Sequence, residues 1–459
     1  MHLNTMESQP LSWRPNLDKT SRSLYITLAK QLEADVQSGD LRPGTKLPPQ
    51  RELAYFLDIN VSTVSKAFKL CEQKGLLSAT VGSGTFVAYD ALSNGNLLLR
   101  PDRESIINLG PTAPETSDHK ILLKMIREML DEAEAGKLFS YFAPGADEWQ
   151  KDAAVKLMGH CGHRAERERI LLAGGGQNAL SALLIALFRR GDKIAVDDHT
   201  YPGIKTTAAM LGIQLVPIPS GRDGLDTVTL EALCQTEKVQ GIYLIPACHN
   251  PTTAVISKEK RVQIARIIKD CGCIFLEDGT YQVLHSGGRG ISDLAPEQSV
   301  YIISLSKGIA PGLRLAYLSV PPAWKDVIAD TLYNLNVATA PIMGELAARV
   351  IASGQFEAII KQHLRHTRER NKIVNRYFGT GYCLGSDDNI FRWLMLPGKY
   401  TGADFEALAL ANGVQVFGAE RFAVGNTIPA RAVRLSVCSP DSLEQLERGV
   451  QIIADLLKA

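Results

Sequence analysis

The chain has 459 residues, more than one ordinary hydrophobic core accommodates, so two or three domains are expected. Hydrophobic residues make up 45% and charged residues 22%, as in soluble globular proteins, and the net charge of +1 does not by itself indicate a polyanionic partner. The eight cysteines form no C-x-x-C pair, which favours a reducing cytoplasm. The polar N-terminus and the absence of a long apolar run argue against a signal peptide and a membrane helix, so a cytoplasmic protein is expected.

Three short helices are predicted in the first seventy-four residues. Leucine or valine recurs at every fourth position from Leu24 to Val36, which indicates an amphipathic helix ending near Gly39. A second helix follows Pro49, and Ser62 is expected to cap a third helix that runs to Lys74. Two short strands around a glycine-rich tip, residues 76–78 and 82–87, complete the segment.

Three helices and a hairpin form a winged helix-turn-helix, in which the third helix enters the major groove of DNA. The third helix would bury Val64, Ala67, Phe68 and Cys71 and present a polar face. Between Arg42 and Lys74 there are six basic and three acidic residues, a mild excess of positive charge. The pattern alone leaves open a small helical bundle with a solvated polar face.

The stretch from Leu24 to Val87 resembles the GntR-type winged helix-turn-helix. The resemblance rests on several motifs in order, namely Leu47-Pro48, Arg51-Glu52-Leu53-Ala54, Thr63-Val64, Ala67-Phe68, Gly75-Leu76-Leu77 and Gly82-Ser83-Gly84-Thr85-Phe86-Val87. It implies double-stranded operator DNA as a partner, contacted through the second helix, the start of the third helix and the wing. The residues in these regions that would contact DNA are Arg51, Ser62, Thr63, Ser65, Lys66, Gly82, Ser83 and Gly84. One departure is Asn60-Val61, where the family usually has Ser-Arg, so DNA preference is expected to differ.

The rest of the chain alternates strands and helices, which predicts an α/β domain with a large, mostly parallel sheet. The predicted strands are Ile170–Leu172, Lys193–Val196, Gln214–Pro217, Gly241–Ile245, Ile274–Glu277, Val300–Ser304 and Arg314–Ser319. The expected organisation is a DNA-binding domain at 18–88, a linker at 89–108 and the large domain at 109–459. A long helical stretch from Gly344 to about Phe378 leads to a small C-terminal α/β part at about 379–459.

Several polar or glycine-rich segments follow these strands, where α/β sheets bind ligands. Each one alone has an ordinary explanation. The glycine-rich turn at 173–177 is common without a phosphate, and Asn250-Pro251 is usually only a turn. Asp278 could merely cap a helix, and a lysine such as Lys307 is usually a surface residue.

In order, these segments resemble fold-type I aminotransferases over about residues 109–459. The resemblance implies pyridoxal 5'-phosphate as the cofactor and Lys307, Asp278 and Tyr281 as the residues that carry its chemistry. Lys307 would bond the cofactor aldehyde, Asp278 would pair with the pyridine nitrogen, and Asn250 with Tyr281 would bind the ring oxygen. Tyr201 would stack on the ring, and the phosphate would be held by Gly175, Gly176, Gln177, Ser304 and Arg314.

Two further residues follow from the same resemblance. Arg434 matches the arginine that binds the α-carboxylate of an amino-acid ligand, although a surface strand arginine is the alternative. Tyr141 resembles a tyrosine that reaches the phosphate of the partner subunit, which implies a homodimer. No metal is expected, because the segment His160–His163 has no second ligand pair and is interpreted as the exposed end of a helix.

A GntR-type head followed by an aminotransferase-like domain resembles the MocR subfamily of regulators. The resemblance implies a transcriptional regulator that senses a vitamin B6 form or a small amino compound through its large domain. Two alternatives stay open: a working aminotransferase with an autoregulatory head, and a DNA-binding module with a cofactor-free large domain. Relatives commonly have Leu-Arg where this chain has Trp149-Gln150, and they commonly have glycine where this chain has Thr253. Transaminase activity is therefore expected to be residual.

Overall fold

The computed structural model describes residues 11–21, 23–80, 84–88, 106–114, 119–133, 135–140, 147–236, 238–285, 288–379 and 381–458. The chain divides into two compact units. The smaller comprises Met1–Asn94 with Ala423–Ile428, and the larger comprises Gly95–Phe422 with Pro429–Ala459.

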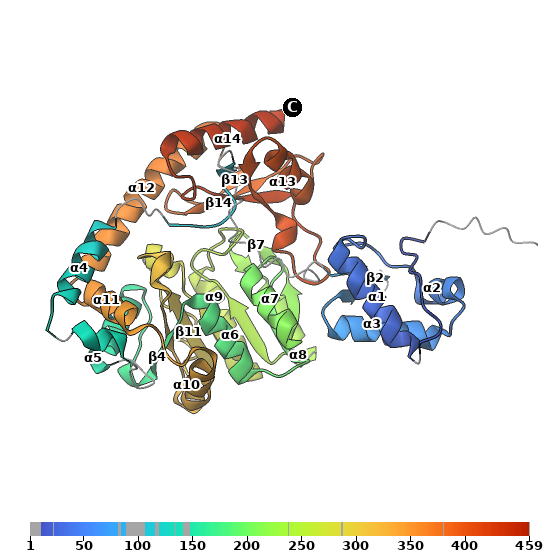
Figure 1. The fold of residues 1–459 in the computed structure, drawn as a ribbon, viewed down its shortest axis with the longest axis horizontal. Helices are drawn as coiled ribbons and strands as arrows, with labels where there is room; N and C mark the ends of the chain where they lie inside the picture. The colour runs from blue at the N-terminus through green and yellow to red at the C-terminus, as the bar shows by residue number, and fades with distance from the viewer. Residues whose placement is uncertain are drawn as a thin grey trace, which may run out of the picture. The chain divides into compact units, whose positions relative to one another are not determined.

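The small unit is a winged helix-turn-helix, which confirms the predicted fold (Figure 1). Its elements are α1 (Leu24–Ser38), α2 (Gln50–Leu57), α3 (Val61–Gln73) and the antiparallel hairpin of β1 (Leu77–Thr80) and β2 (Gly84–Val87). Helix α1 ends at Gly39, whose φ of +87° is open to glycine without a steric penalty. Leu28, Leu53, Val64 and Phe68 are among the almost fully buried side chains of its core.

Residues before the first helix also belong to this core. Trp13 and Leu17 are only 6% and 9% exposed, and the indole Nε1 of Trp13 donates a hydrogen bond to Asp35 Oδ2 at 2.7 Å. The apolar periodicity could not predict this, because both residues lie outside any regular element. The stability of the small unit therefore depends on a segment that precedes its helices.

The predicted cap of the third helix is wrong by two residues. Asn60, not Ser62, occupies the cap position, and its side-chain Oδ1 accepts a hydrogen bond from the backbone N–H of Ser62 at 2.8 Å. Either residue type can cap a helix, so composition alone did not decide. The helix begins at Val61, which places that side chain at its first turn.

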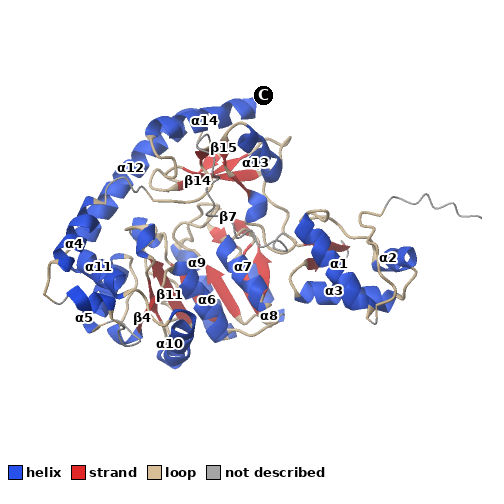
Figure 2. Ribbon diagram, viewed as in Figure 1, coloured by secondary structure: helices blue, strands red, loops and turns tan. Residues whose placement is uncertain are grey.

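The large unit is built on a seven-stranded sheet in the order β4-β12-β11-β10-β9-β5-β6, and all seven strands were predicted. Six of these strands run in one direction and β12 runs in the opposite direction. The strands are β4 (Ile170–Ala173), β5 (Lys193–Asp197), β6 (Gln214–Ile218), β9 (Gly241–Leu244), β10 (Ile274–Asp278), β11 (Ser299–Ser304) and β12 (Ala316–Ser319). The helices around them (Figure 2) are α5 (Glu148–His160), α6 (Gly176–Leu187), α7 (Pro202–Leu211), α8 (Thr227–Thr236), α9 (Lys258–Cys271) and α10 (Pro322–Asn336).

A second, antiparallel sheet lies toward the C-terminus. It has the order β13-β14-β17-β16 and comprises β13 (Cys383–Leu384), β14 (Phe391–Met395), β17 (Ala432–Ser436) and β16 (Phe417–Gly418). The remaining elements are α4 (Lys120–Leu130), α11 (Pro341–Ala352), α12 (Gln355–Tyr377), α13 (Gly402–Ala411), α14 (Leu443–Lys458), the hairpin of β7 (Ser220–Gly221) and β8 (Gly224–Leu225), and β3 (Ile107–Asn108) paired with β15 (Val414–Gln415). β3 is formed by the last two residues of the predicted linker.

The helical stretch predicted at 344–378 is helical in the structure and consists of two helices. Helix α11 ends before Ser353, and α12 begins after Gly354, whose φ is +79°. A left-handed residue breaks the run of helical hydrogen bonds and allows the chain to change direction.

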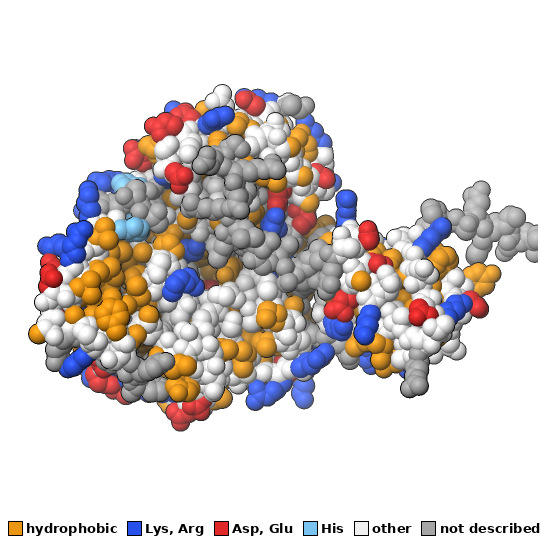
Figure 3. All heavy atoms as spheres, viewed as in Figure 1, with side chains coloured by type: hydrophobic (Ala, Val, Ile, Leu, Met, Phe, Trp, Pro, Cys, Tyr) orange, Lys and Arg blue, Asp and Glu red, His pale blue; other side chains and the backbone are white. Residues whose placement is uncertain are grey.

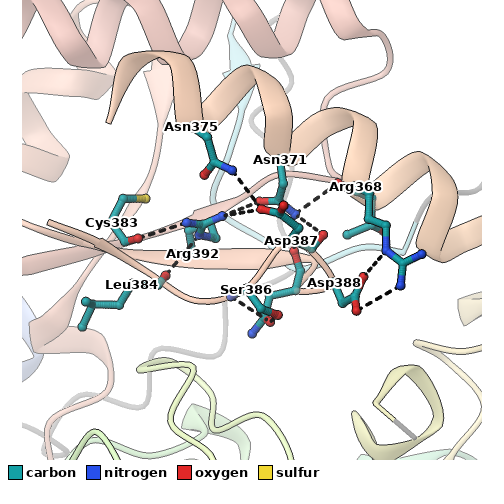
Figure 4. A network of polar contacts seen from close by, with 11 residues as sticks. Arg368, Asn371, Asn375, Cys383, Leu384, Ser386, Asp387, Asp388 and Arg392 are labelled. Carbon is teal, nitrogen blue, oxygen red and sulfur yellow. Dashed lines mark hydrogen bonds and ion pairs between the residues drawn. The ribbon is translucent and has the colours of Figure 1, made fainter. Parts of the chain in front are cut away.

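A buried arginine ties α12 to the C-terminal sheet (Figure 4). Arg392 on β14 is 2% exposed, and its guanidinium donates to Asn371 Oδ1 at 3.0 Å and to the carbonyl oxygens of Cys383 at 3.0 Å and Leu384 at 3.2 Å. Burying a charge is costly unless its donors are paired, and here every nitrogen of the guanidinium has an oxygen partner. The network fixes β14, and hence its neighbour β17, against the helix.

Residues 160–163 lie at the end of α5, as predicted, but the expectation that this end is exposed is wrong for Cys161 and His163. Cys161 and His163 are 2% and 6% exposed. His163 stacks on Tyr301 with 4.2 Å between ring centroids, and its Nδ1 lies 2.8 Å from Asp293 Oδ1. Within the described ranges, His, Cys, Asp and Glu side chains form no group of three that could hold a metal ion.

Candidate cofactor and DNA-binding sites

The parallel topology brings the predicted strand-end residues to one edge of the large sheet. The glycine-rich turn follows β4, Asp278 ends β10, and Lys307 follows β11. Because these strands are parallel, their carboxyl ends lie at the same edge. Arg314 precedes β12, and since β12 is antiparallel its beginning lies at that edge too.

The glycine-rich turn forms a close cradle with Arg314 and Ser304. A Cβ atom on Gly175 would lie 2.6 Å from Arg314 Nη2, and one on Gly176 would lie 3.2 Å from the Cβ of Ser304. Gly175 also has a φ of +99°. Only glycine leaves room there for an arginine and for a ligand at the N-terminus of α6, where backbone N–H groups favour an anion.

Two hydroxyl residues complete this cradle, and the sequence reasoning missed both. The Oγ of Ser306 accepts a hydrogen bond from Arg314 Nη1 at 3.4 Å and one from Ser304 Oγ at 3.2 Å. Thr280 Oγ1 lies 3.9 Å from the position of a Cβ on Gly176. Ser306 lies between Ser304 and Lys307 in the motif itself, so its spacing was a usable signal.

Gln177 and Tyr201 contact one another. The hydroxyl of Tyr201 donates to Gln177 Oε1 at 3.0 Å, while Gln177 Nε2 donates to the Gly203 carbonyl at 3.1 Å and to Thr207 Oγ1 at 2.8 Å. The side chain of Gln177 therefore links α6 to α7. The pKa of Tyr201 is raised to about 12, first by burial and then by the nearby Asp278 carboxylate.

Asp278 is a half-buried carboxylate with two donors. Tyr243 donates its hydroxyl hydrogen to Oδ2 at 2.9 Å, and the backbone N–H of Thr280 donates to Oδ1 at 3.0 Å. Burial raises the pKa of Asp278, and these hydrogen bonds oppose that shift. Tyr243 lies within β9 and carried no sequence signal, because its partner is 35 residues away.

Lys307 is held by the segment that precedes α4. Its Nζ donates to the carbonyl oxygen of Thr112 at 2.6 Å and to Thr112 Oγ1 at 3.2 Å. Burial, followed by repulsion from Arg434 and Arg314, lowers the pKa of Lys307 to about 8. A lysine with such a pKa supplies a neutral, nucleophilic amine near neutral pH.

Arg434 is fully inside the site, which rules out the surface alternative. It is 3% exposed, and its guanidinium donates to Asn250 Oδ1 at 2.6 Å and to the Gly110 carbonyl at 2.8 Å. Its Nε has no hydrogen-bond partner among the described residues. The guanidinium carbon also lies 4.9 to 5.7 Å from the ring centroids of three aromatic residues, Phe391, Phe417 and Phe422.

Tyr281 and Asn250 flank these groups. Tyr281 is 5% exposed and packs edge-on against Phe391 with 5.3 Å between ring centroids, and burial raises the pKa of its hydroxyl. Asn250 is 2% exposed, and the peptide bond between it and Pro251 is cis. Tyr141, by contrast, lies outside the described residues.

The predicted DNA-contacting residues lie on the exposed side of α2 and α3. Arg51, Ser62 and Lys66 are not buried in the core of the unit, and Thr63 and Ser65 are half-buried. Ser65 Oγ donates to Gln50 Oε1 at 2.5 Å, so this hydroxyl is engaged within the unit. In the wing, Gly84 has a φ of +115°, and Gly82 and Ser83 are outside the described residues.

Comparison with known protein families identifies both parts of the chain. Residues 104–453 match the aminotransferase class I and II family, and residues 24–87 match the bacterial regulatory proteins of the gntR family. The chain belongs to the GntR-type regulators that carry an aminotransferase domain. A similar protein is the HTH-type transcriptional regulator YdeF of Bacillus subtilis (strain 168), which is 51% identical over 458 residues, 100% of this chain and 99% of that protein.

More distant relatives agree with this assignment. The probable rhizopine catabolism regulatory protein MocR of Rhizobium meliloti is 24% identical over 76% of each chain. The crystal structure of the α-aminoadipate aminotransferase LysN of Thermus thermophilus superposes with a TM-score of 0.70 and 20% identity, covering 80% of the regulator and 96% of LysN. The regulator therefore combines a DNA-binding head with the aminotransferase fold. No helix in the described part of the chain has the length and apolar character to span a membrane.

Proposed function

We propose that the regulator binds pyridoxal 5'-phosphate in its large unit and senses an amino compound or a B6 vitamer there, and that this changes its affinity for operator DNA. The observation that carries the proposal is the convergence of Lys307, Asp278 and Arg314 at one sheet edge, with Arg434 in electrostatic reach of Lys307. Asp278, Lys307 and Arg314 stand at the ends of three consecutive strands of the large sheet, whereas Arg434 comes from β17 of the C-terminal sheet. Arg434 is buried, Asp278 and Lys307 are half-buried and Arg314 is exposed, and a surface without a ligand has no need of such a mixed-charge group.

The residues present fit the cofactor. Arg314, Ser304, Ser306 and the backbone of the glycine-rich turn would hold the phosphate, because they line the cradle that a Cβ on Gly175 or Gly176 would fill. Asp278 would face the pyridine nitrogen, whose proton offsets the cost of the half-buried carboxylate. Bound in this way, the cofactor supplies an aldehyde that bonds primary amines and a ring that withdraws electrons from them.

The ligand that best fits the effector site is a compound that carries both an amine and a carboxylate. Arg434 has two nitrogens engaged with Asn250 and Gly110 and a third without a partner among the described residues. A carboxylate accepts the fork of a guanidinium in bidentate form and would replace the neutral carbonyl of Gly110. Ligand binding would thus free the segment Gly110–Thr112, which also accepts the hydrogen bonds of Lys307.

This segment offers a route from ligand to DNA. Gly110–Thr112 continues from β3, and the chain before β3 leads to the winged helix. A ligand changes DNA affinity only by the free energy with which it distinguishes two arrangements of the protein. Release of Gly110–Thr112 is a candidate for that difference.

The proposal includes a homodimer, with Tyr141 completing the partner's phosphate site. Hydrophobic side chains gather on the face over α4 (Figure 3), where Leu123 and Leu130 are 50% and 46% exposed. Phe139, in the short 3-10 helix Ala135–Phe139, is 74% exposed. A patch of this kind is typical of a protein interface.

The experiment is DNA affinity by fluorescence anisotropy at fixed salt, with the segment upstream of the protein's own gene as the probe. The protein is stripped of cofactor, measured, reloaded with pyridoxal phosphate and measured again. A change in affinity on reloading supports the sensor. Equal affinity in both states, without and with added amino acids, contradicts it.

A working aminotransferase is the second candidate, favoured by the lowered pKa of Lys307. Against strong turnover, Gln150 stands where relatives commonly have arginine, and its Nε2 donates to Glu345 at 3.1 Å. Formation of a 2-oxo acid from an amino acid at many equivalents per protein would favour the enzyme. A single equivalent, equal to the loaded cofactor, would favour the sensor.

A further inference from the structure

At the beginning of α3 an exposed aliphatic residue lies next to polar side chains that already have hydrogen-bond partners. Val61 is the first residue of the helix and is 41% exposed. It does not belong to the apolar core of the small unit, nor to the partly buried residues Leu24, Ile59 and Leu70 that pack against it. Folding therefore does not explain why a valine stands there.

The polar groups next to Val61 are less free than the sequence indicates. Asn60 uses its Oδ1 to cap the helix by accepting from the backbone N–H of Ser62, and Ser65 donates to Gln50. An amide or hydroxyl that is engaged in this way loses part of its capacity to bind a base edge. The side chains left at the first turn are Val61 itself and the hydroxyls of Ser62 and Thr63.

The first turn of the third helix is the part of a helix-turn-helix that contacts base edges. Valine has no donor or acceptor, so it cannot read the polar atoms of a base pair. The one apolar group that a base presents in the major groove is the C5-methyl of thymine. Two cationic residues outside the core, Arg51 on α2 and Lys66 one turn into α3, suit DNA phosphates and favour DNA over a protein as the occupant.

We propose that Val61 packs against the C5-methyl group of a thymine and so gives the regulator a preference for a T·A pair at that position. The inference rests on the proposed DNA binding and specifies which chemical feature of the operator is read. Tyr55, which is 91% exposed and lies one turn after Arg51 on α2, presents a further side chain on the same helix face as Arg51.

The test compares thymine with deoxyuridine, which lacks only the methyl group. Full-length protein loaded with pyridoxal phosphate first selects duplexes from a random library. The best duplex is then made with thymine or with deoxyuridine, and the two dissociation constants are measured. Burial of one methyl group predicts about fourfold weaker binding of the deoxyuridine duplex per head.

Two variants assign the effect to one residue. Val61→Ala should bring the ratio of the two dissociation constants close to one. Ile26→Ala, at a position on α1 that is 37% exposed, should keep the wild-type ratio. A wild-type ratio near one, or a Val61→Ala ratio equal to that of the wild type, overturns the inference while DNA binding stands. If no duplex is selected at all, the proposed DNA binding is overturned as well. Failure of the thymine preference and failure of the proposed function therefore give different results.

Discussion

The Nζ atom of Lys307 lies 2.6 Å from the carbonyl oxygen of Thr112, on a segment 195 residues earlier in the chain. Two residues before Thr112, the carbonyl oxygen of Gly110 accepts a hydrogen bond from the guanidinium of Arg434. One short segment thus accepts hydrogen bonds from both Lys307 and Arg434. A ligand that bonds the lysine and pairs with the arginine must compete with this segment for both.

Attachment of the cofactor to Lys307 should depend on pH. The pKa of Lys307 is lowered to about 8, so the amine becomes neutral as the pH rises through 8. Only the neutral amine attacks an aldehyde, so the initial rate of attachment should rise about tenfold between pH 7 and pH 9. Borohydride reduction followed by peptide mapping measures it. A flat profile, or a label on another lysine, contradicts the assignment.

Arg434→Lys should weaken binding of amino acids. Lysine cannot reproduce the planar fork that holds a carboxylate, so the dissociation constant should rise about 10- to 100-fold. Titration of the cofactor absorbance measures it, with the decarboxylated amine of the same amino acid as the matched ligand, which should be unaffected. Arg368→Lys, at a surface pair with Asp388, is the control variant. Equal losses for both ligands would remove Arg434 from the carboxylate site.

Thr253→Gly should stabilise the large unit. Thr253 has a φ of +64°, a region that a β-branched residue adopts at a cost of about 1–2 kcal/mol. Glycine removes this cost, although it increases the entropy of the unfolded chain by about 0.5–1 kcal/mol. The expected net gain is about 0.5–1 kcal/mol, seen as a higher thermal midpoint. Thr253→Ala, which retains a Cβ, should raise the thermal midpoint less. A lower thermal midpoint for Thr253→Gly than for the wild type would contradict backbone strain at this position.

Trp13→Ala should destabilise the winged helix by about 3–4 kcal/mol, because it removes a buried aromatic side chain and its hydrogen bond to Asp35. Trp13→Phe retains most of the apolar volume and should lose only about 1 kcal/mol. Hydrogen exchange of the small unit's amides measures both. Similar exchange in wild type and Trp13→Ala would show that the segment before α1 contributes little.

Arg51→Ala and Lys66→Ala should each weaken binding to all duplexes alike and reduce the salt dependence of binding by about one ion. Neither side chain takes part in the core of the small unit. Lys30→Ala, at an exposed position on α1, is the control. An unchanged slope for Arg51→Ala or Lys66→Ala would exclude that residue from phosphate contact.

Much of the fold was predictable because its signals are local. Each of the seven strands of the large sheet is a short apolar run with polar or glycine-rich ends, and α1 and α3 show helical periodicity. The break at Ser353-Gly354 carried a signal in its glycine, but the helical patterns on both sides of it concealed the break. Trp13 carried none, because its burial depends on side chains of the helices that follow it in the chain.

The site divides in the same way. The sequence by itself determined the motifs in which Lys307, Asp278, Arg314 and Arg434 stand, and the order of these motifs predicts a cofactor site. The partners of these residues, Thr112, Tyr243, Ser306 and Gly110, emerged almost entirely from the tertiary structure. The reason is physical. A motif consists of residues that are close together in the sequence. The pKa of a lysine and the hydrogen bonds of a guanidinium depend instead on burial and on oxygen atoms from distant parts of the chain.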